Sequence, residues 1–516
     1  MPSEGDGQID RLRDAKGIDV ADFDARVREE AAVVHDHVAA GTFDNEQVTI
    51  GLEYEFYAVD RETCQVRRIP RSLLGCVGFV EELGLHNTEL NSAVHPLTSV
   101  GVDALAADVT AKVEAFQRLA ADRGIRLVSD GMWTIGPAAG STVAYLTEAT
   151  RGDGLTLGIN VSNSTRYHGF GSFDDDRMIG GRIDVPGASI EADNAGPVSL
   201  TTSIQPHYQC RRAADLPAYH GIALRLAGPL LALAVNSPLL PPALYDDPGP
   251  DPTVLLETGY AEHRVPIYEG MMNPTRGDPK VTFPRDIDAP GEAIDRIVDD
   301  AILVPAEIAA AERFDDAFVH FRHKHGSYWR WVRPVFEGST ERAANVRIEF
   351  RPLPGQPTIP DTVAFLAAFC GLLTELVESA HPVADLPWER ARGNFYAAAE
   401  DGLDADLAWI TADGERTTDT DRLYEDLLSA AASGLERHGC SASRAAELLA
   451  PLRARVDRRL TPASWKRNAV AAALDSGATP AEAIERAQRA YIDRQAATLS
   501  DGSLVEWPEP TAGDGT

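Results

Sequence analysis

The chain has 516 residues, more than one ordinary hydrophobic core accommodates, so we expect one large domain and an accessory region. Its 79 acidic residues outnumber 48 Lys and Arg, and a net charge of −31 repels nucleic acid and anionic lipid surfaces. Acidic residues are spread along the chain and lysines number only five, which is typical of proteins from a high-salt cytoplasm. We therefore predict a halophilic protein with no nucleic-acid or membrane partner.

The cysteines and the apolar segments indicate a cytoplasmic protein. Five cysteines are scattered without Cys-x-x-Cys spacing, which argues against a disulfide framework and against structural zinc. The N-terminal stretch MPSEGDGQIDRLRDAKGIDV is polar and acidic, whereas a signal peptide starts basic and continues apolar. The apolar stretch 226–242 is interrupted by Gly228, Pro229, Asn236 and Pro238, so it falls short of the roughly 18 apolar residues of a membrane span.

The periodicity of the apolar residues predicts irregularly alternating strands and helices up to about residue 380. In chain order, the expected elements are a helix at 24–41, a strand at 50–60, a helix followed by a short strand within 109–131, strands at 198–210 and 344–353, and a core helix at 362–379. The helix within 109–131 should end near Gly124. Strands mixed with helices in this way indicate an α+β fold.

Beyond residue 380 the texture changes to helices rich in Ala, Arg and Leu. One of them should begin at Thr479, where Pro480 and Glu482 complete a capping box with proline at the first helical position. The end of the chain, EWPEPTAGDGT, reads as a disordered tail. The predicted division is a polar N-terminal arm and helix (1–45), a large domain (46–380), and a helical C-terminal region with that tail (381–516).

The opening strand, IGLEYEFYAVD, contains two glutamates one residue apart. Because strand side chains alternate between faces, Glu53 and Glu55 lie on one face, with Leu52, Tyr54 and Phe56 on the other. Two like charges on one half-buried face are unfavourable by roughly 1 kcal/mol or more. A divalent cation between them would relieve this repulsion.

Two further strands carry polar residues with the same period of two. VRIEFR places Arg347, Glu349 and Arg351 on one face, a row suited to holding a metal through the carboxylate and phosphate or carboxylate oxygens through the guanidiniums. TSIQPHYQ aligns Ser203, Gln205 and His207, two of which are of the types that bind a metal or a phosphate. Mg²⁺ takes oxygen ligands and is usually shared between carboxylates and nucleotide phosphates.

Each pattern also has a simpler explanation. In so acidic a chain, Glu-x-Glu also fits the solvated face of a strand. Arg-x-Glu-x-Arg also fits a surface ion-pair row worth about 0–1 kcal/mol. A lone histidine such as His207 is usually structural. The order of the motifs along the chain is what favours the functional interpretation.

That order resembles glutamate–cysteine ligase family 2, the carboxylate–amine ligases related in fold to glutamine synthetase. IGLEYEFYAVD resembles the family's opening strand, TRYHGF its Arg-Tyr segment with Arg166, and TTSIQPHYQ its Thr/Ser-x-Gln strand. ALAVNSPLL resembles its Ala-Asn-Ser-Pro segment with Asn236, ETGYAEHR its Gly-Tyr-x-x-x-Arg with Tyr260 and Arg264, and VRIEFRPLPGQPT its closing strand. The resemblance extends over about residues 46 to 500.

The chain departs from the family pattern at three places. TELNSAVHPLTS (88–99) stands where a strand with a further glutamate ligand is expected, so Glu89 and His95 are both candidates for that position. The histidine pair common in the third strand is Gln205-Pro206-His207 here. Pro354 stands where an acidic residue commonly follows the closing strand.

The resemblance implies a curved antiparallel sheet around the active site, backed by helices, and an ATP-dependent ligase. By resemblance, Mg²⁺ or Mn²⁺ is held by Glu53, Glu55 and Glu349, and charge is neutralised by Arg264, Arg347 and Arg351. ATP or substrate contacts are implied for Arg166, Gln205, His207, Asn236 and Tyr260. All partners are then small molecules: ATP, an amino-acid carboxylate and an amine.

The favoured reaction joins the γ-carboxylate of glutamate to the amine of cysteine, giving γ-glutamylcysteine, ADP and phosphate. Two alternatives stay open: a ligase of the same family with another amine, and a non-catalytic binding or regulatory protein that kept the fold. The sequence leaves the oligomeric state open.

Overall fold

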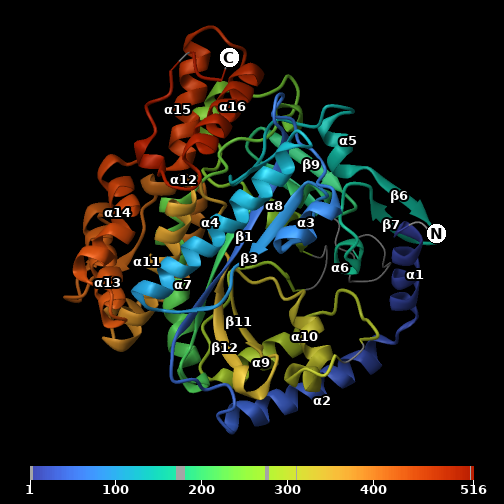
Figure 1. The fold of residues 1–516 in the computed structure, drawn as a ribbon, viewed down its shortest axis with the longest axis vertical. Coiled ribbons are helices and arrows are strands. Elements are labelled where there is room, and N and C mark those ends of the chain that lie inside the picture. Colours follow the sequence, from blue (N-terminus) through green and yellow to red (C-terminus); the bar gives the residue numbers. More distant parts are fainter. Residues whose placement is uncertain (1–3, 170–180, 274–277, 309–310, 512, 516) are drawn as a thin grey trace.

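The computed structural model describes residues 4–169, 181–273, 278–308, 311–511 and 513–515 (Figure 1). Its centre is a curved antiparallel sheet, as the sequence predicts. The strand order is β11 (Val332–Glu337), β12 (Asn345–Phe350), β10 (Ile204–Gln209), β1 (Thr49–Asp60), β3 (Asn87–Asn91) and β2 (Phe79–Glu81). Two short strands, β4 (His95–Pro96) and β5 (Ile125–Val128), also pair with β1.

The long strand β1 lies in the middle of the sheet and has one apolar face and one face that carries glutamates. Leu52, Tyr54 and Phe56 are at most 3 % exposed and pack into the core, as the alternation predicts. The opposite face carries Glu53 and Glu55. Burying one face fixes the register of the strand, since a slip of one residue would bring the glutamates into the core.

Helices back the apolar face of the sheet. The long helices α7 (Leu216–Ala234) and α11 (Ile359–Glu378) pack on strands β10, β11 and β12. Helix α12 (Trp388–Asp401) covers α7, and α13 (Thr420–Arg437) and α14 (Ala442–Arg458) cover α11. Helix α11 is apolar and long enough to span a membrane, but 89 % of its most apolar window is buried in the protein, so it is a core helix.

The remaining helices and strands surround this centre. The helices are α1 (Glu4–Gly17), α2 (Val20–Ala39), α3 (Arg71–Val77), α4 (Ser99–Ala121), α5 (Thr142–Thr147), α6 (Thr165–His168), α8 (Arg264–Met272), α9 (Pro290–Asp299), α10 (Val319–His325), α15 (Pro462–Asp475) and α16 (Pro480–Thr498). The outer hairpins are β6 (Ala149–Gly152) with β7 (Leu155–Gly158), β8 (Gly181–Val185) with β9 (Ala188–Ala192), and β13 (Trp409–Ile410) with β14 (Arg416–Thr417).

Local capping explains where several predicted helices begin. Thr479 accepts from the backbone N–H of Glu482, whose carboxylate accepts from the backbone N–H of Thr479 at 2.8 Å, so the predicted capping box of α16 is confirmed. The helix predicted at 24–41 begins earlier, at Val20, because Asp19 caps it. The strand predicted from residue 198 begins only at Ile204, because Gly196–Leu200 form a 3₁₀ helix with proline in its first turn.

The end of the chain is more ordered than its composition predicts. Trp507 is only 7 % exposed, and its ring packs on Trp465 of α15 and Tyr491 of α16. Its indole N–H donates to Thr498 at 2.9 Å. The predicted disorder is therefore wrong for the stretch around Trp507, because a buried aromatic anchor outweighs the surrounding Pro and Gly.

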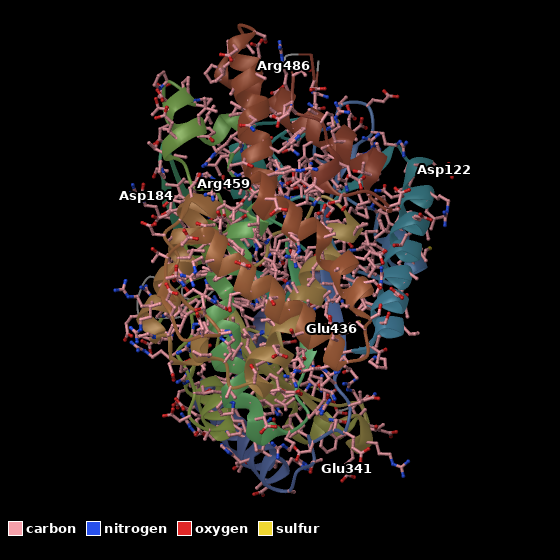
Figure 2. All side chains as sticks on the ribbon, turned by 90° about the vertical axis from the view of Figure 1, so that its left-hand side faces the viewer. Asp122, Asp184, Glu341, Glu436, Arg459 and Arg486 are labelled. Carbon is pink, nitrogen blue, oxygen red and sulfur yellow. The ribbon has the colours of Figure 1, made fainter. Side chains whose placement is uncertain are left out.

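One hydrophobic core runs from Ala15 in α1 to Trp507 near the end of the chain. The helices beyond residue 380 share this core with α7 and α11. The division of the chain into regions at residues 45 and 380 therefore stays a prediction, based on changes in amino-acid composition. Exposed acidic side chains include Asp122, Asp184, Glu341 and Glu436, which project from the surface in Figure 2.

Candidate active site

The register of the central strands gathers polar side chains on one face of the sheet. Glu53 pairs with Gln205 across β1 and β10, and Glu55 pairs with Glu89 across β1 and β3. His207 of β10 pairs with Glu349 of β12. Directly paired residues of antiparallel strands share a face, so one continuous row of ligand-type side chains crosses four strands.

These side chains form two adjoining groups whose possible ligand atoms lie within 4.8 Å of one another. The first group, called here the carboxylate cluster, consists of Glu55, Glu82 and Glu89. The second, called the mixed cluster, consists of Glu53, His207 and Glu349. The resemblance assigned Glu53, Glu55 and Glu349 to one metal set, but same-face neighbours along a strand are about 7 Å apart. Glu55 therefore groups with Glu89 on the paired strand β3, whereas Glu53 and Glu349 group with His207 of β10.

The carboxylate cluster is held in place by neutral donors. They are the backbone N–H of Ser203 (2.7 Å) and the amide of Gln205 (3.0 Å) on Glu55, the hydroxyl of Tyr167 (2.9 Å) on Glu82, and the amide of Asn91 (2.8 Å) on Glu89. Arg166 stands one step away and donates to the Tyr167 hydroxyl at 2.9 Å. Within the part of the chain that the structure describes, these three carboxylates form no direct ion pair.

Burial and mutual repulsion raise the proton affinity of this cluster. Burial, followed by the charge of Glu82, raises the pKa of Glu55 to about 7. Burial and the charges of Glu53, Glu82 and Glu55 raise the pKa of Glu89 well above its usual value. Burial also raises the pKa of Glu82, although Arg166 works against it. Three crowded carboxylates with no direct counter-ion among the described residues fit a hard divalent cation, which prefers oxygen ligands.

In the mixed cluster, arginine side chains of the protein itself neutralise the charge of Glu349. Arg333 donates to one oxygen of Glu349 at 2.9 Å, and Arg351 donates to the other. Arg351 also donates to the amide oxygen of Gln205 at 2.5 Å, which links the two clusters. Burial alone would raise the pKa of Glu349, but Arg333 and Arg351 hold it well below its usual value. The donor set of two carboxylates and one imidazole fits a divalent cation once these guanidiniums make room.

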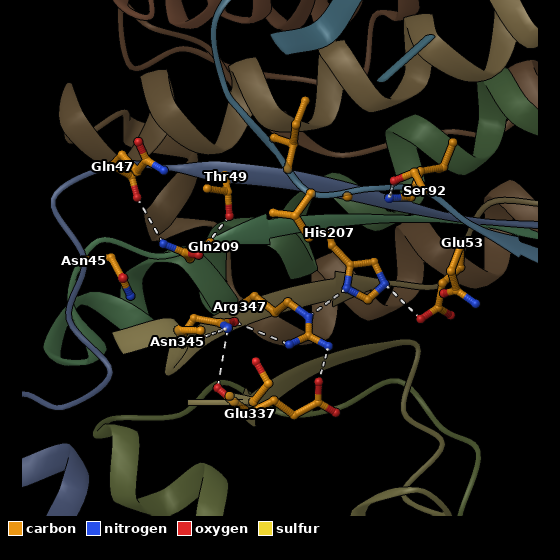
Figure 3. A pocket seen from close by; sticks show the side chains of 18 of the residues that line it. Asn45, Gln47, Thr49, Glu53, Ser92, His207, Gln209, Glu337, Asn345 and Arg347 are labelled. Carbon is orange, nitrogen blue, oxygen red and sulfur yellow. Dashed lines mark hydrogen bonds and ion pairs between the residues drawn. The ribbon is translucent and has the colours of Figure 1, made fainter. Parts of the chain in front are cut away.

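Arg347 and His207 connect the mixed cluster to the strand beside it (Figure 3). The Arg347 Nε donates to His207 Nδ1 at 3.0 Å, and another guanidinium nitrogen donates to Glu337 at 2.9 Å. The other ring nitrogen of His207, Nε2, lies 3.3 Å from a carboxylate oxygen of Glu53. The histidine is therefore sandwiched between a cation and an anion.

Two cavities open beside the mixed cluster. One, of about 590 Å³, is lined by polar side chains that include Gln47, Thr49, Gln209, Asn345 and Arg347 (Figure 3). The other, of about 370 Å³, is lined by Glu53 and Glu349 and by four arginines, Arg166, Arg322, Arg333 and Arg347. Guanidiniums gathered beside metal-type ligands suit the binding of phosphate or carboxylate groups.

Not all of the predicted residues reach this face. Arg264 is 1 % exposed and donates to the backbone carbonyls of Arg351 (3.0 Å) and Pro352 (3.4 Å), so it contacts the end of the strand rather than the cavity. Tyr260 packs beside His263, and neither cavity is lined by it.

Asn236 belongs to a different polar network. Its amide donates to Gly355 at 2.6 Å and to the Tyr491 hydroxyl at 3.0 Å, and its backbone carbonyl accepts from Lys466 at 2.8 Å. It is fully buried there, which indicates a role in joining the C-terminal helices to the sheet.

The structure separates the two candidates for the additional ligand. Glu89 lies in β3 opposite Glu55 and belongs to the carboxylate cluster. His95 lies in β4 opposite Ile50, outside both clusters.

Sequence reasoning missed three residues of the site, Glu82, Arg333 and Glu337. Arg333 and Glu337 alternate along β11, so a signal was present, but Pro334 between them argues against a central strand. The strand lies at the sheet edge, where proline is tolerated. Glu82 follows the short strand β2, and no periodicity marks it.

Comparison with known proteins identifies the class. The model of glutamate–cysteine ligase family 2 matches residues 49–497, so the chain belongs to this family, and the enzyme class is that of the carboxylate–amine ligases. The resemblance predicted from the motifs is thereby confirmed. Among curated proteins, none matches the sequence.

Solved structures give only loose likenesses. A glutamate–cysteine ligase from Francisella tularensis in complex with AMP is 14 % identical, with a TM-score of 0.48 over 89 % of this chain and 93 % of that one. A bifunctional glutathione synthetase from Pasteurella multocida is 13 % identical, with a TM-score of 0.49 over 90 % of this chain and 55 % of that one. The complex of the prokaryotic ubiquitin-like protein Pup and its ligase PafA is 10 % identical, with a TM-score of 0.40 over 86 % of this chain and 73 % of that one. These values are too low to add to the family assignment.

Proposed function

We propose that the protein is an ATP-dependent glutamate–cysteine ligase that forms γ-glutamylcysteine, ADP and phosphate. The observation that supports this best is the pairing of two ligand clusters on one sheet face with an arginine-lined cavity beside them. Transfer of a phosphoryl group to a carboxylate needs little covalent help from a protein, because catalysis is positioning and charge neutralisation.

The residues divide into roles by their positions. Divalent cations, Mg²⁺ or Mn²⁺, would be held by the carboxylate cluster and the mixed cluster and would supply charge neutralisation for the phosphates of ATP. We assign Arg333, Arg347 and Arg351 to the transferred phosphoryl group, since Arg333 and Arg351 bind Glu349 and Arg333 and Arg347 line the smaller cavity. We assign the base and ribose of ATP to the larger cavity, whose amide side chains offer both donors and acceptors.

The reaction then runs in two steps. The γ-carboxylate of glutamate attacks the γ-phosphorus, the bond to the ADP oxygen breaks, and an acyl phosphate forms. The amine of cysteine attacks the acyl carbon, loses a proton, and displaces phosphate. Arg264 acts through Arg351: its hydrogen bonds to the backbone carbonyls of Arg351 and Pro352 fix the end of β12, so we assign it a positioning role.

Arg166 borders the other side of the site. It lines the smaller cavity and reaches the carboxylate cluster through Tyr167 and Glu82. This placement suits recognition of a carboxylate of the amino-acid substrate. Gln205 touches both Glu55 and Arg351 and so aligns the two clusters.

The test is release of ADP with glutamate and a panel of amines, measured at high KCl. Activity that depends on cysteine supports the proposal, and γ-glutamylcysteine is then identified by mass spectrometry. Activity with a different amine would assign the protein to another ligase of the same family. No ADP release with any amine would favour a non-catalytic relic of the fold. Glu55→Gln is the negative control, because it removes a charge from the carboxylate cluster.

A further inference from the structure

The hydrogen bond between Arg347 and His207 determines where the histidine carries its proton. A guanidinium only donates, so the Arg347 Nε, 3.0 Å from His207 Nδ1, requires a lone pair on that nitrogen. The single ring proton of His207 is then on Nε2. This is the nitrogen that faces the mixed cluster, 3.3 Å from the Glu53 carboxylate (Figure 3).

A protonated ring nitrogen has no lone pair to offer a metal. A histidine that ligates through Nε2 carries its proton on Nδ1 and usually donates it to an acceptor behind the ring. Arg347 occupies that place here and is not an acceptor. As long as Arg347 stays, the mixed cluster therefore offers two carboxylates and no imidazole ligand.

Arg347 is the arginine of this group that is best placed to move. Its side chain is 22 % exposed, compared with 13 % for Arg333 and 11 % for Arg351. It lines both cavities, and Glu337 holds its far end at 2.9 Å. An anion bound in either cavity competes directly for its guanidinium.

We propose that Arg347 is a positioning residue that keeps His207 unavailable as a ligand until an anion draws the guanidinium away. This inference rests on the proposed function and deepens it. When Arg347 leaves, the ring proton moves from Nε2 to Nδ1 through solvent, with no net gain or loss of protons. Without such an anion, the mixed cluster offers a cation only its two carboxylates and binds it more weakly than with His207 as a ligand.

The experiment is a titration with Mn²⁺, followed by electron paramagnetic resonance and calorimetry, without nucleotide. The full chain is used as wild type, Arg347→Met, His207→Gln and the double variant, with thermal unfolding as a check on folding. Arg347→Met should tighten the weaker class of Mn²⁺ sites at least tenfold. Removing a positive charge also favours a cation, so the matched comparison is the same substitution in the His207→Gln background. A glutamine oxygen can ligate whether or not Arg347 is present, so the gain there should be much smaller.

Each outcome decides the proposal. An equal gain in both backgrounds would mean that only charge was removed, which overturns it. Two Mn²⁺ bound with similar affinity to the nucleotide-free wild type would also overturn it. If Arg347→Met does not fold, wild type still decides, with one bound Mn²⁺ expected without adenylyl imidodiphosphate and two with it. No binding of Mn²⁺ under any condition would overturn the proposed function itself.

Discussion

The two clusters differ in how their charge is balanced, although they lie side by side on one sheet. In the carboxylate cluster, the donors to Glu55, Glu82 and Glu89 are neutral among the described residues, and the pKa values of the three glutamates are raised. In the mixed cluster, Arg333 and Arg351 bind Glu349 and lower its pKa. A cation from outside therefore relieves repulsion in the first cluster, whereas in the second it must compete with the protein's own guanidiniums.

The largest expected effect comes from removing a charge in the carboxylate cluster. Glu55→Gln should lower turnover by roughly a hundredfold or more. The loss of one ligand charge weakens the binding of a cation that would stabilise the transition state by several kcal/mol. The fold should be kept, since Gln preserves the shape and relieves repulsion. Rates of ADP release and the thermal unfolding midpoint check both statements.

The control is Glu81→Gln, on the adjacent strand β2. Glu81 is exposed, pairs with Arg71 at 2.6 Å, and belongs to neither cluster although it precedes Glu82 in the chain. Its loss should leave turnover unchanged. If Glu55→Gln and Glu81→Gln behave alike, the carboxylate cluster has no part in the reaction.

The second prediction concerns the guanidinium that links the clusters. Arg351 binds Glu349 and Gln205 through one guanidinium nitrogen, which leaves the rest of the planar group for a phosphate, and a lysine ammonium has no second nitrogen for that contact. Arg351→Lys should reduce ADP formation at least tenfold, a barrier increase of about 1.4 kcal/mol, with an unfolding midpoint within a few degrees of wild type. Arg437→Lys, a surface arginine paired with Glu375, should have no effect. Unchanged turnover in Arg351→Lys would contradict the assignment of the end of β12 to the active site.

Period-two alternation places many, but not all, of the polar residues on the sheet face. Glu53, Glu55, Gln205, His207, Glu349 and Arg351 all lie on strands, so the sequence places each on the correct face. Their division into two clusters depends on strand register, which a single sequence does not reveal. Glu82 follows a strand of three residues and arrives through tertiary packing alone. Asn236 lies in a buried polar network, and a single sequence does not separate such a network from a ligand site because both use the same residue types.

The third prediction separates the clusters by pH. Burial and the charge of Glu82 raise the pKa of Glu55 to about 7, so at pH 8 Glu55 of the metal-free cluster is mostly ionised and repels its neighbours, and at pH 6 it carries a proton that a cation must displace. A raised acid pKa means that the metal-free protein loses stability as pH rises through about 7. Mg²⁺ should therefore raise the unfolding midpoint more at pH 8 than at pH 6. Glu82→Gln should reduce this difference, and an equal Mg²⁺ effect at both pH values in wild type would contradict the assignment.

The smallest expected effect comes from monovalent salt, which tests the surface rather than the clusters. With a net charge of −31, the folded state repels itself when the Debye length is about 30 Å, at 0.01 M salt, and much less when it is about 3 Å, at 1 M. The midpoint of thermal unfolding should rise with KCl up to molar concentrations. The exposed carboxylates, such as Asp122 and Glu436, are open to this screening, whereas the buried carboxylate cluster is screened far less (Figure 2). Wild type and Glu82→Gln should therefore show the same KCl dependence while differing in their response to Mg²⁺. A midpoint that does not change with KCl would dispose of the halophilic interpretation, and a KCl response that Glu82→Gln abolishes would mean that the cluster, rather than the surface, senses the salt.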